Sequence, residues 1–155
     1  MFKSNFTGLL DKINAQGDEE HLKSLIADFL KFTWYKDAFQ INPIGKNDLV
    51  IHTGKLPADP IGVILEVKSF VNKTEMISEQ KPNAKAIHEL ILYYLNERIT
   101  NNKHEIKQLI ATNIFEWFVF ASLNYKICKY SFFQLINFLL PSLYSYNPIK
   151  CSSSE

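Results

Sequence analysis

The residues best suited to chemistry are an acidic and a basic side chain in the most strand-like segment of the chain. Side chains alternate across a strand, so Glu66 and Lys68 share one face of residues 63–68 while the aliphatic side chains take the other. Burying a carboxylate and an ammonium in so apolar a strand is costly. Asp48 stands at the start of the preceding apolar segment. A hairpin between the two segments would bring Asp48 beside Glu66.

Two carboxylates and a lysine at one sheet edge suit metal-assisted hydrolysis of a phosphodiester. Mg²⁺ and Mn²⁺ take oxygen ligands, commonly one or two carboxylates together with a substrate phosphate. Such a metal polarises the phosphate and generates hydroxide, and a neighbouring lysine orients the water or neutralises the developing charge. The chemistry that this Asp…Glu-x-Lys arrangement allows is therefore metal-dependent phosphodiester cleavage.

The elements that must position these residues alternate between helix and strand. Three segments carry apolar residues at helical spacing, and four have the composition of strands. Helices are expected at residues 6–13, 18–30 and 82–101, and strands at 48–53, 61–70, 108–112 and 116–120. Strands on both sides of a long helix predict an α/β fold with helices flanking a mixed sheet. The link between the first two strands suits a loose hairpin, so the sheet is expected to begin as an antiparallel pair.

The composition excludes several classes of protein. Hydrophobic residues make up 46% of the 155 residues, which is too many for an intrinsically disordered chain. With 17 basic and 16 acidic residues, any contact with nucleic acid must come from a local patch and not from bulk charge. Two cysteines cannot form a disulfide framework, and no segment approaches the ~20 apolar residues that cross a bilayer. We therefore expect a soluble, cytoplasmic protein.

Longer stretches around these residues resemble a known family, the PD-(D/E)xK nucleases. In particular, they resemble the N-terminal nuclease region of type IIG restriction–modification enzymes, in which a nuclease and an adenine methyltransferase share one polypeptide. The proline of the nominal motif is absent, since Asn47 precedes Asp48, but this position varies widely in the family. The matching stretches are residues 47–51, 65–69, 72–76, 85–90, 93–94 and 111–117.

The resemblance implies a restriction-endonuclease-like fold and a Mg²⁺-dependent endonuclease that acts on double-stranded DNA. It implies metal binding at Asp48 and Glu66 and catalytic support from Lys68. Many members add an acidic residue from the helix before the sheet. Glu19 suits this role better than Glu20, because Glu19 lies about 50° from the centre of the apolar stripe of its helix and Glu20 about 150°. The positive first turn of the helix is an alternative reason for a glutamate there.

Two further residues on the long helix have a simpler interpretation. Lys85 and Glu89 are four residues apart on the polar face of that helix. Side chains at this spacing are neighbours on a helix surface and commonly form an exposed ion pair. We therefore expect Lys85 and Glu89 to pair at the surface.

The resemblance covers residues 1–120 and ends where the composition changes. Only four of residues 121–155 are charged, against 29 of the first 120. We therefore divide the chain into a nuclease-like domain, 1–120, and a divergent C-terminal tail, 121–155. Leu135, Leu139 and Leu143 could form a helix that packs on the domain, and the alternative is a tail that arose by truncation or frameshift.

The function has two other interpretations beside the nuclease. The chain has no Asn-Pro-Pro-Tyr motif and no glycine-rich cofactor loop, so methylation is not assigned to it. A methyltransferase and specificity region would then be encoded separately or lost. The alternatives are an inactive remnant and a non-enzymatic interaction module that keeps the nuclease fold.

Overall fold

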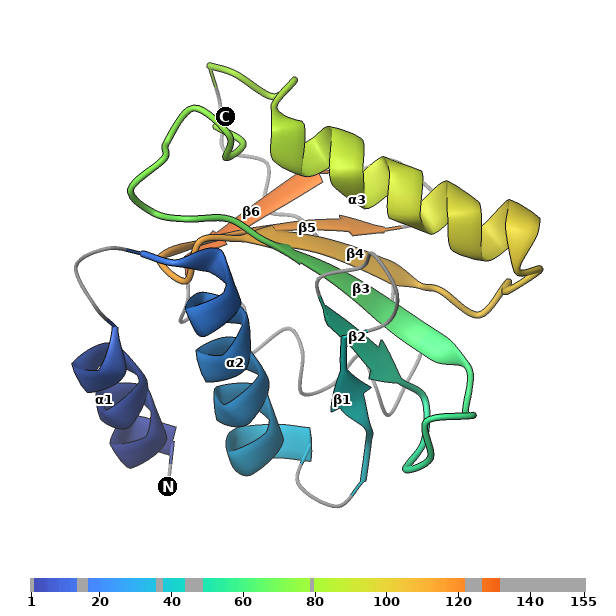
Figure 1. Cartoon of the computed structure of the whole chain (residues 1–155), viewed down its shortest axis with the longest axis horizontal. Helices are drawn as coiled ribbons and strands as arrows, with labels where there is room; N and C mark the ends of the chain where they lie inside the picture. Colours follow the sequence, from blue (N-terminus) through green and yellow to red (C-terminus); the bar gives the residue numbers. More distant parts are fainter. Residues whose placement is uncertain are drawn as a thin grey trace.

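A computed structural model gives the structure of the chain and describes residues 2–13, 17–35, 38–43, 49–78, 80–121 and 127–131. In these ranges, three α-helices and one six-stranded mixed sheet form an α/β fold (Figure 1). The strands lie side by side in chain order, and each pair is antiparallel except β3 and β4, which are parallel. They are β1 (Ile41–Asn42), β2 (Leu49–His52), β3 (Ile61–Val67), β4 (Gln108–Thr112), β5 (Glu116–Ala121) and β6 (Ile127–Ser131).

Helices cover both faces of the sheet (Figure 1). α2 (Glu19–Leu30), with α1 (Phe2–Lys12) beside it, packs on one face, and α3 (Lys85–Leu95) packs on the other. Alternation along β3 explains how one strand serves both layers, because Val63 and Leu65 belong to the core under α2 and Ile64 to the core under α3. A π-helical turn follows two of the helices, η1 (Lys31–Tyr35) after α2 and η2 (Asn96–Thr100) after α3.

The start of α2 is fixed by its local sequence. Asp18 is the N-cap, and its Oδ1 accepts a hydrogen bond from the backbone N–H of Glu20 at 2.9 Å. Gly17 has φ +61° and lies against the loop that follows β3, where a Cβ would come within 2.9 Å of Ser69 Oγ and Val71 Cγ2. Only glycine combines this backbone conformation with so close an approach. The N-terminus of α2 is thereby held next to the carboxyl end of β3.

The α/β fold predicted from the sequence is confirmed. β2 and β3 form the expected antiparallel pair, and α3 is the crossover between the parallel strands β3 and β4. The long helix begins at Lys85, three residues later than predicted, and continues into η2. The sequence did not indicate β1, which has two residues, or β6, which lies in the segment that we expected to be a divergent tail.

The described helices are short. α2, with 12 residues, falls well below the ~20 needed to cross a bilayer. Accordingly, no helix in the described ranges has both the length and the apolar character of a membrane span.

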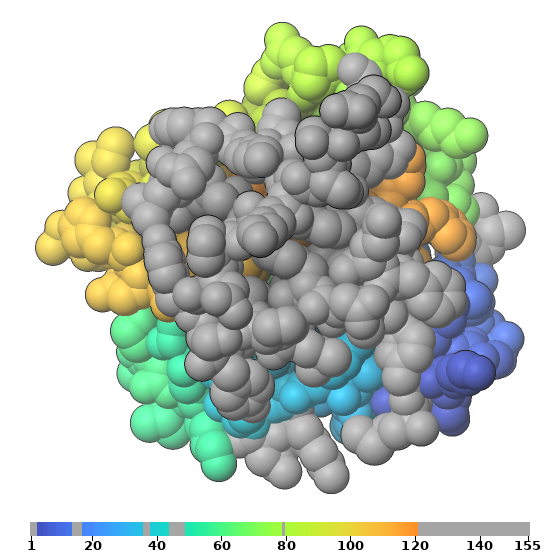
Figure 2. All heavy atoms as spheres, turned by 180° about the vertical axis from the view of Figure 1, so that it is seen from behind, coloured from blue at the N-terminus to red at the C-terminus, as the bar shows by residue number. Residues whose placement is uncertain are grey.

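Seen from behind, α1 (blue) and the C-terminal part of α3 with η2 (yellow) lie at opposite edges of the molecule (Figure 2).

Candidate active site

Glu66 and Lys68 lie at the carboxyl end of β3. Glu66 pairs in register with Ala111 of β4, and the backbone N–H of Lys68 donates to the carbonyl of Thr112 at 2.9 Å. Both side chains point to the face that α3 covers, and only 1% of the Glu66 side chain and 4% of the Lys68 side chain are exposed. An acidic and a basic group are therefore buried together inside an otherwise apolar layer.

The Lys68 ammonium is surrounded by three carboxylates from three different elements. Its Nζ lies 2.5 Å from Oε1 of Glu66 on β3, 2.6 Å from Oε2 of Glu89 on α3 and 3.8 Å from Oε2 of Glu19 on α2. Glu19 also accepts a hydrogen bond from the backbone N–H of Ser69 through Oε1, at 3.3 Å. We call Glu19, Glu66, Lys68 and Glu89 the Lys68 cluster. It joins both helical layers to the end of the central strand.

The electrostatics of the cluster keep Lys68 charged. Burial acts to lower the pKa of Lys68, but hydrogen bonds to Glu66 and Glu89 and the charges of Glu66 and Glu19 outweigh it, so the pKa is raised above its ordinary value. Burial acts to raise the pKa of Glu89, but its hydrogen bond with Lys68 and the charges of Lys68 and Lys85 outweigh this and lower it. At neutral pH Lys68 is therefore an ammonium, suited to stabilising negative charge and unsuited to accepting a proton.

A more exposed ion pair lies next to the cluster. Nζ of Lys85 is 2.9 Å from Oε2 of Glu75 and 4.0 Å from Oε1 of Glu89. Asn72 donates to Oε1 of Glu75 at 2.8 Å. Exposed pairs of this kind contribute little to stability, but this one ties the connection after β3 to the first turn of α3.

The structure brings three of the four predicted site residues together. Glu19 lies toward the end of β3, whereas 80% of the side chain of Glu20 is exposed, as helical geometry predicts. Asp48 lies outside the described residues. The next residue, Leu49, is described and pairs in register with Leu65, the residue before Glu66. The separation of the Asp48 and Glu66 carboxylates stays a prediction.

The donor chemistry of the cluster fits a hard divalent cation. Carboxylate oxygens suit Mg²⁺ and Mn²⁺ better than the softer metals that prefer thiolate or imidazole. Among the described residues, however, no group of three His, Cys, Asp or Glu side chains is arranged to hold a metal ion. Lys68 lies between Glu66 and Glu89 in this arrangement. The ligand set that we predict therefore requires Asp48 together with Glu66.

Glu89 is the site residue that sequence reasoning missed. Its expected surface pair with Lys85 is a distant contact of 4.0 Å, whereas Lys68 lies at 2.6 Å. That prediction used the i, i+4 spacing, which compares residues within one helix and contains no information about the sheet that the helix packs on. The contact of Glu89 with Lys68 joins α3 to the end of β3, so no pattern within the helix alone indicates it.

His52 lies on β2, the strand beside β3, but its hydrogen bonds go to residues outside the Lys68 cluster. It is buried, with Nδ1 2.6 Å from the carbonyl of Asp59 and Nε2 2.9 Å from Oδ1 of Asn42. These contacts tie β1 and the link before β3 to β2. His52 therefore has a structural role in holding the hairpin together.

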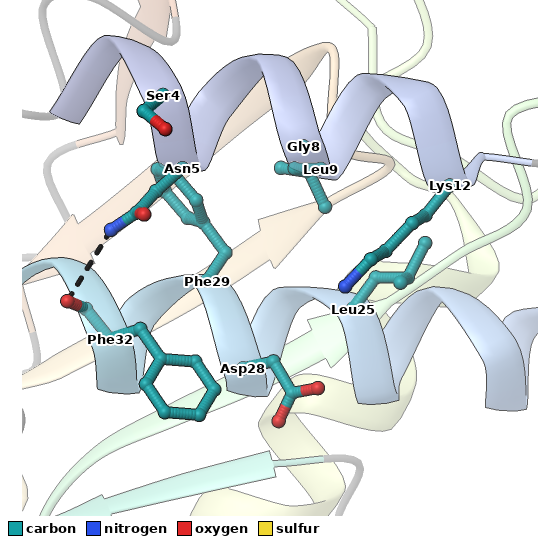
Figure 3. A pocket seen from close by; sticks show the side chains of 9 residues that line it. All are labelled: Ser4, Asn5, Gly8, Leu9, Lys12, Leu25, Asp28, Phe29 and Phe32. Carbon is teal, nitrogen blue, oxygen red and sulfur yellow. Dashed lines mark hydrogen bonds between the residues drawn. The ribbon is translucent and has the colours of Figure 1, made fainter. Parts of the chain in front are cut away.

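A separate groove lies between α1 and α2, away from the Lys68 cluster. It has a volume of about 190 Å³, and Asn5 of α1 donates across it to the carbonyl of Phe32 in η1 at 3.4 Å (Figure 3). Its lining contains none of the cluster residues. It is formed by Ser4, Asn5, Gly8, Leu9, Lys12, Leu25, Asp28, Phe29 and Phe32.

Residues 1–139 match a protein family described as a domain of unknown function, DUF7149. The chain belongs to this family. Comparison with curated proteins gives no match, and comparison with solved structures gives none either. The matched range contains the whole Lys68 cluster and Asp48, so the cluster lies within the DUF7149 domain.

The DUF7149 match also extends past the change in composition at residue 121. β6 lies inside the matched range and pairs with β5 over five positions, from Glu116 with Ser131 to Phe120 with Ile127. The end of the sheet therefore does not coincide with residue 120. The helix considered for Leu135, Leu139 and Leu143 lies outside the described residues.

Proposed function

We propose that the chain is a metal-dependent endonuclease domain of the restriction–modification type that acts on double-stranded DNA. The observation that carries the proposal is the buried Lys68 ammonium at the end of β3, in contact with Glu66. The antiparallel pairing of β2 with β3 supports the prediction that Asp48 joins them. A charged lysine and a carboxylate buried together are costly unless paired. Phosphodiester chemistry would also require a second carboxylate, and we predict that Asp48 supplies it at the carboxyl end of β3.

Each group in the proposed site has a distinct task. Asp48 and Glu66 would hold Mg²⁺ or Mn²⁺, which supplies Lewis-acid polarisation and a hydroxide near neutral pH. Lys68, protonated because its pKa is raised, stabilises negative charge that develops on the phosphate. Glu19 fixes the backbone of Ser69 and adds negative charge near Lys68. In this proposal Lys68 is an electrostatic group, and the proton of the attacking water is not transferred to it.

The choice of DNA is supported by the resemblance and by local charge. The formal net charge is only +1, so contact with a phosphate backbone requires a local patch. The connection between β3 and α3 carries two exposed lysines, Lys73 and Lys81, and Lys85 is exposed at the start of α3, 4.0 Å from Glu89. Sequence recognition would come from a partner region of the restriction–modification system, because base-specific contacts need surface beyond such a patch.

Cleavage of supercoiled plasmid DNA with Mg²⁺ or Mn²⁺ tests the proposal. The wild-type chain is expected to nick or linearise the plasmid, whereas Glu66→Gln and Lys68→Met are not. Glu20→Gln is the matched control, because Glu20 follows Glu19 on α2 but lies in solvent. Cleavage that survives Glu66→Gln unchanged, or that never occurs with either metal, would count against the nuclease.

One observation favours a second candidate, a binding module that keeps this fold without catalysis. Lys68 already neutralises much of the charge of Glu66 and Glu89, so the cluster forms a stable ion-pair network without a metal. A melting temperature that does not respond to saturating Mg²⁺ or Mn²⁺ would favour this candidate, because a ligand bound only to the folded state raises stability.

A further inference from the structure

We propose that Glu89 is a positioning residue that holds the Lys68 ammonium in place when Glu66 binds the metal ion. This inference rests on the proposed function and adds to it a residue on α3. It follows from the geometry of the Lys68 cluster, in which one lysine is shared between a carboxylate on the sheet and a carboxylate on the helix above it.

The Glu66 carboxylate cannot interact at full strength with both the Lys68 ammonium and a metal ion. Its Oε1 lies 2.5 Å from Nζ of Lys68, and the ammonium repels a divalent cation brought to the same carboxylate. Metal binding at Glu66 therefore weakens the contact with Lys68. A lysine side chain that is 4% exposed then needs another anion, because an unpaired buried charge is strongly unfavourable.

Glu89 is the group placed to take over that contact. Its Oε2 already lies 2.6 Å from Lys68, whereas Oε2 of Glu19 lies at 3.8 Å, beyond hydrogen-bond distance. The backbone that carries Glu89 is firmly held, because Ala86 and Leu90 on either side of it in α3 are fully buried against the sheet. Glu89 itself is partly exposed, so its carboxylate keeps the Lys68 contact without being sealed into the apolar layer.

Positioning differs from direct ligation in its dependence on Lys68. If Glu89 acts by drawing Lys68 away from Glu66, its loss weakens metal binding only while Lys68 is present. If Glu89 binds the metal itself, its loss weakens binding with or without Lys68. A double-mutant cycle on metal affinity separates these two roles.

The experiment measures Mn²⁺ affinity of the full chain by titration calorimetry for wild type, Glu89→Gln, Lys68→Met and the double variant. Glu89→Gln is expected to weaken Mn²⁺ binding roughly ten- to a hundredfold, the usual effect of removing a residue that orients a metal site. In the Lys68→Met background the same change is expected to have little effect. Glu20→Gln, which also removes one negative charge from the same region, controls for bulk attraction of the cation.

Each outcome supports or overturns the inference. Equal losses in both backgrounds would overturn it in favour of direct ligation, and a loss no larger than that of Glu20→Gln would overturn it in favour of a surface role. Failure of the wild-type chain to bind Mn²⁺ would instead overturn the proposed function, and the inference with it. If Glu89→Gln or Lys68→Met does not fold, Glu89→Asp retains the charge but shortens the side chain. It is then expected to lower Mn²⁺ affinity by less than tenfold, and an unchanged affinity would count against positioning.

Discussion

Two buried glutamates on the α3 side of the molecule are each paired with a lysine, but the two pairs are built in different ways. Glu97 lies 2.7 Å from Lys103, and its other oxygen accepts a hydrogen bond from Asn101 at 3.1 Å. Glu97 lies in η2 and the other two residues follow its end, where Lys103 also donates its backbone N–H to the carbonyl of Glu97. The Glu97–Lys103 pair is therefore a local contact that stabilises the end of η2.

The Lys68 cluster, in contrast, is assembled from distant parts of the chain. Its residues come from α2, β3 and α3, so the contacts form only when both helical layers are docked on the sheet. The comparison shows that burial of an ion pair does not by itself indicate a functional site. The informative features are the excess of carboxylates over lysine and the convergence of separate elements, which a local helix end does not need.

Replacing Lys68 is expected to give the largest difference in stability between the Lys68 cluster and the Glu97–Lys103 pair. Lys68→Met should lower the free energy of unfolding by about 3–5 kcal/mol, because it leaves buried carboxylates without their counter-ion. Urea denaturation followed by circular dichroism measures the change. Adding Glu66→Gln to Lys68→Met should recover part of the loss. A loss below about 1 kcal/mol would mean that the cluster is more hydrated than its burial indicates.

Binding of Mn²⁺ is expected to stabilise the chain through the Lys68 cluster and not through the Glu97–Lys103 pair. Mn²⁺ at a hundred times its dissociation constant should stabilise the chain by about 2.7 kcal/mol. Glu66→Gln and Asp48→Asn should abolish this increment, whereas Glu97→Gln should keep it. Asp48→Asn should leave the metal-free melt nearly unchanged or raise it, since repulsion between carboxylates is relieved. An increment that persists in both variants would place the metal elsewhere.

Acid should weaken the Lys68 cluster through Glu89. The folded-state pKa of Glu89 is lowered, so its contribution is present above the unfolded value of about 4.3 and is lost as the pH falls through the folded value. At pH 7 we expect Glu89→Gln to cost about 1.5–3 kcal/mol, typical of a hydrogen bond to a charged group. Below pH 4 the difference from wild type should shrink. Thermal melts of both proteins between pH 3 and pH 7 measure this difference in stability. A difference that stays constant over that range would contradict the role of the Glu89 charge.

The sequence indicated the local part of this architecture and missed the parts that depend on distant contacts. Period-2 alternation placed Glu66 and Lys68 on one face of β3, and helical geometry turned Glu19 toward the sheet, because both rules describe a single element. Glu89 was assigned to Lys85, since spacing along α3 cannot reveal that Lys68 lies beneath it. β6 was missed because the fall in charged residues after residue 120 was interpreted as the start of a divergent tail, whereas residues 127–131 pair with β5.

The smallest effect is expected at the local pair. The side chain of Lys103 is 35% exposed, so water can solvate Glu97 when the lysine is replaced, and Asn101 still donates to that carboxylate. Lys103→Met should therefore cost about 1 kcal/mol or less, in the range of partly exposed pairs. It should leave the Mn²⁺ response intact, because Glu97 takes no part in the proposed site. Parallel urea titrations of Lys103→Met and Lys68→Met make the comparison directly. Equal losses for the two variants would show that convergence of distant elements adds nothing to the energy of a buried ion pair, and the distinction between the two regions would fail.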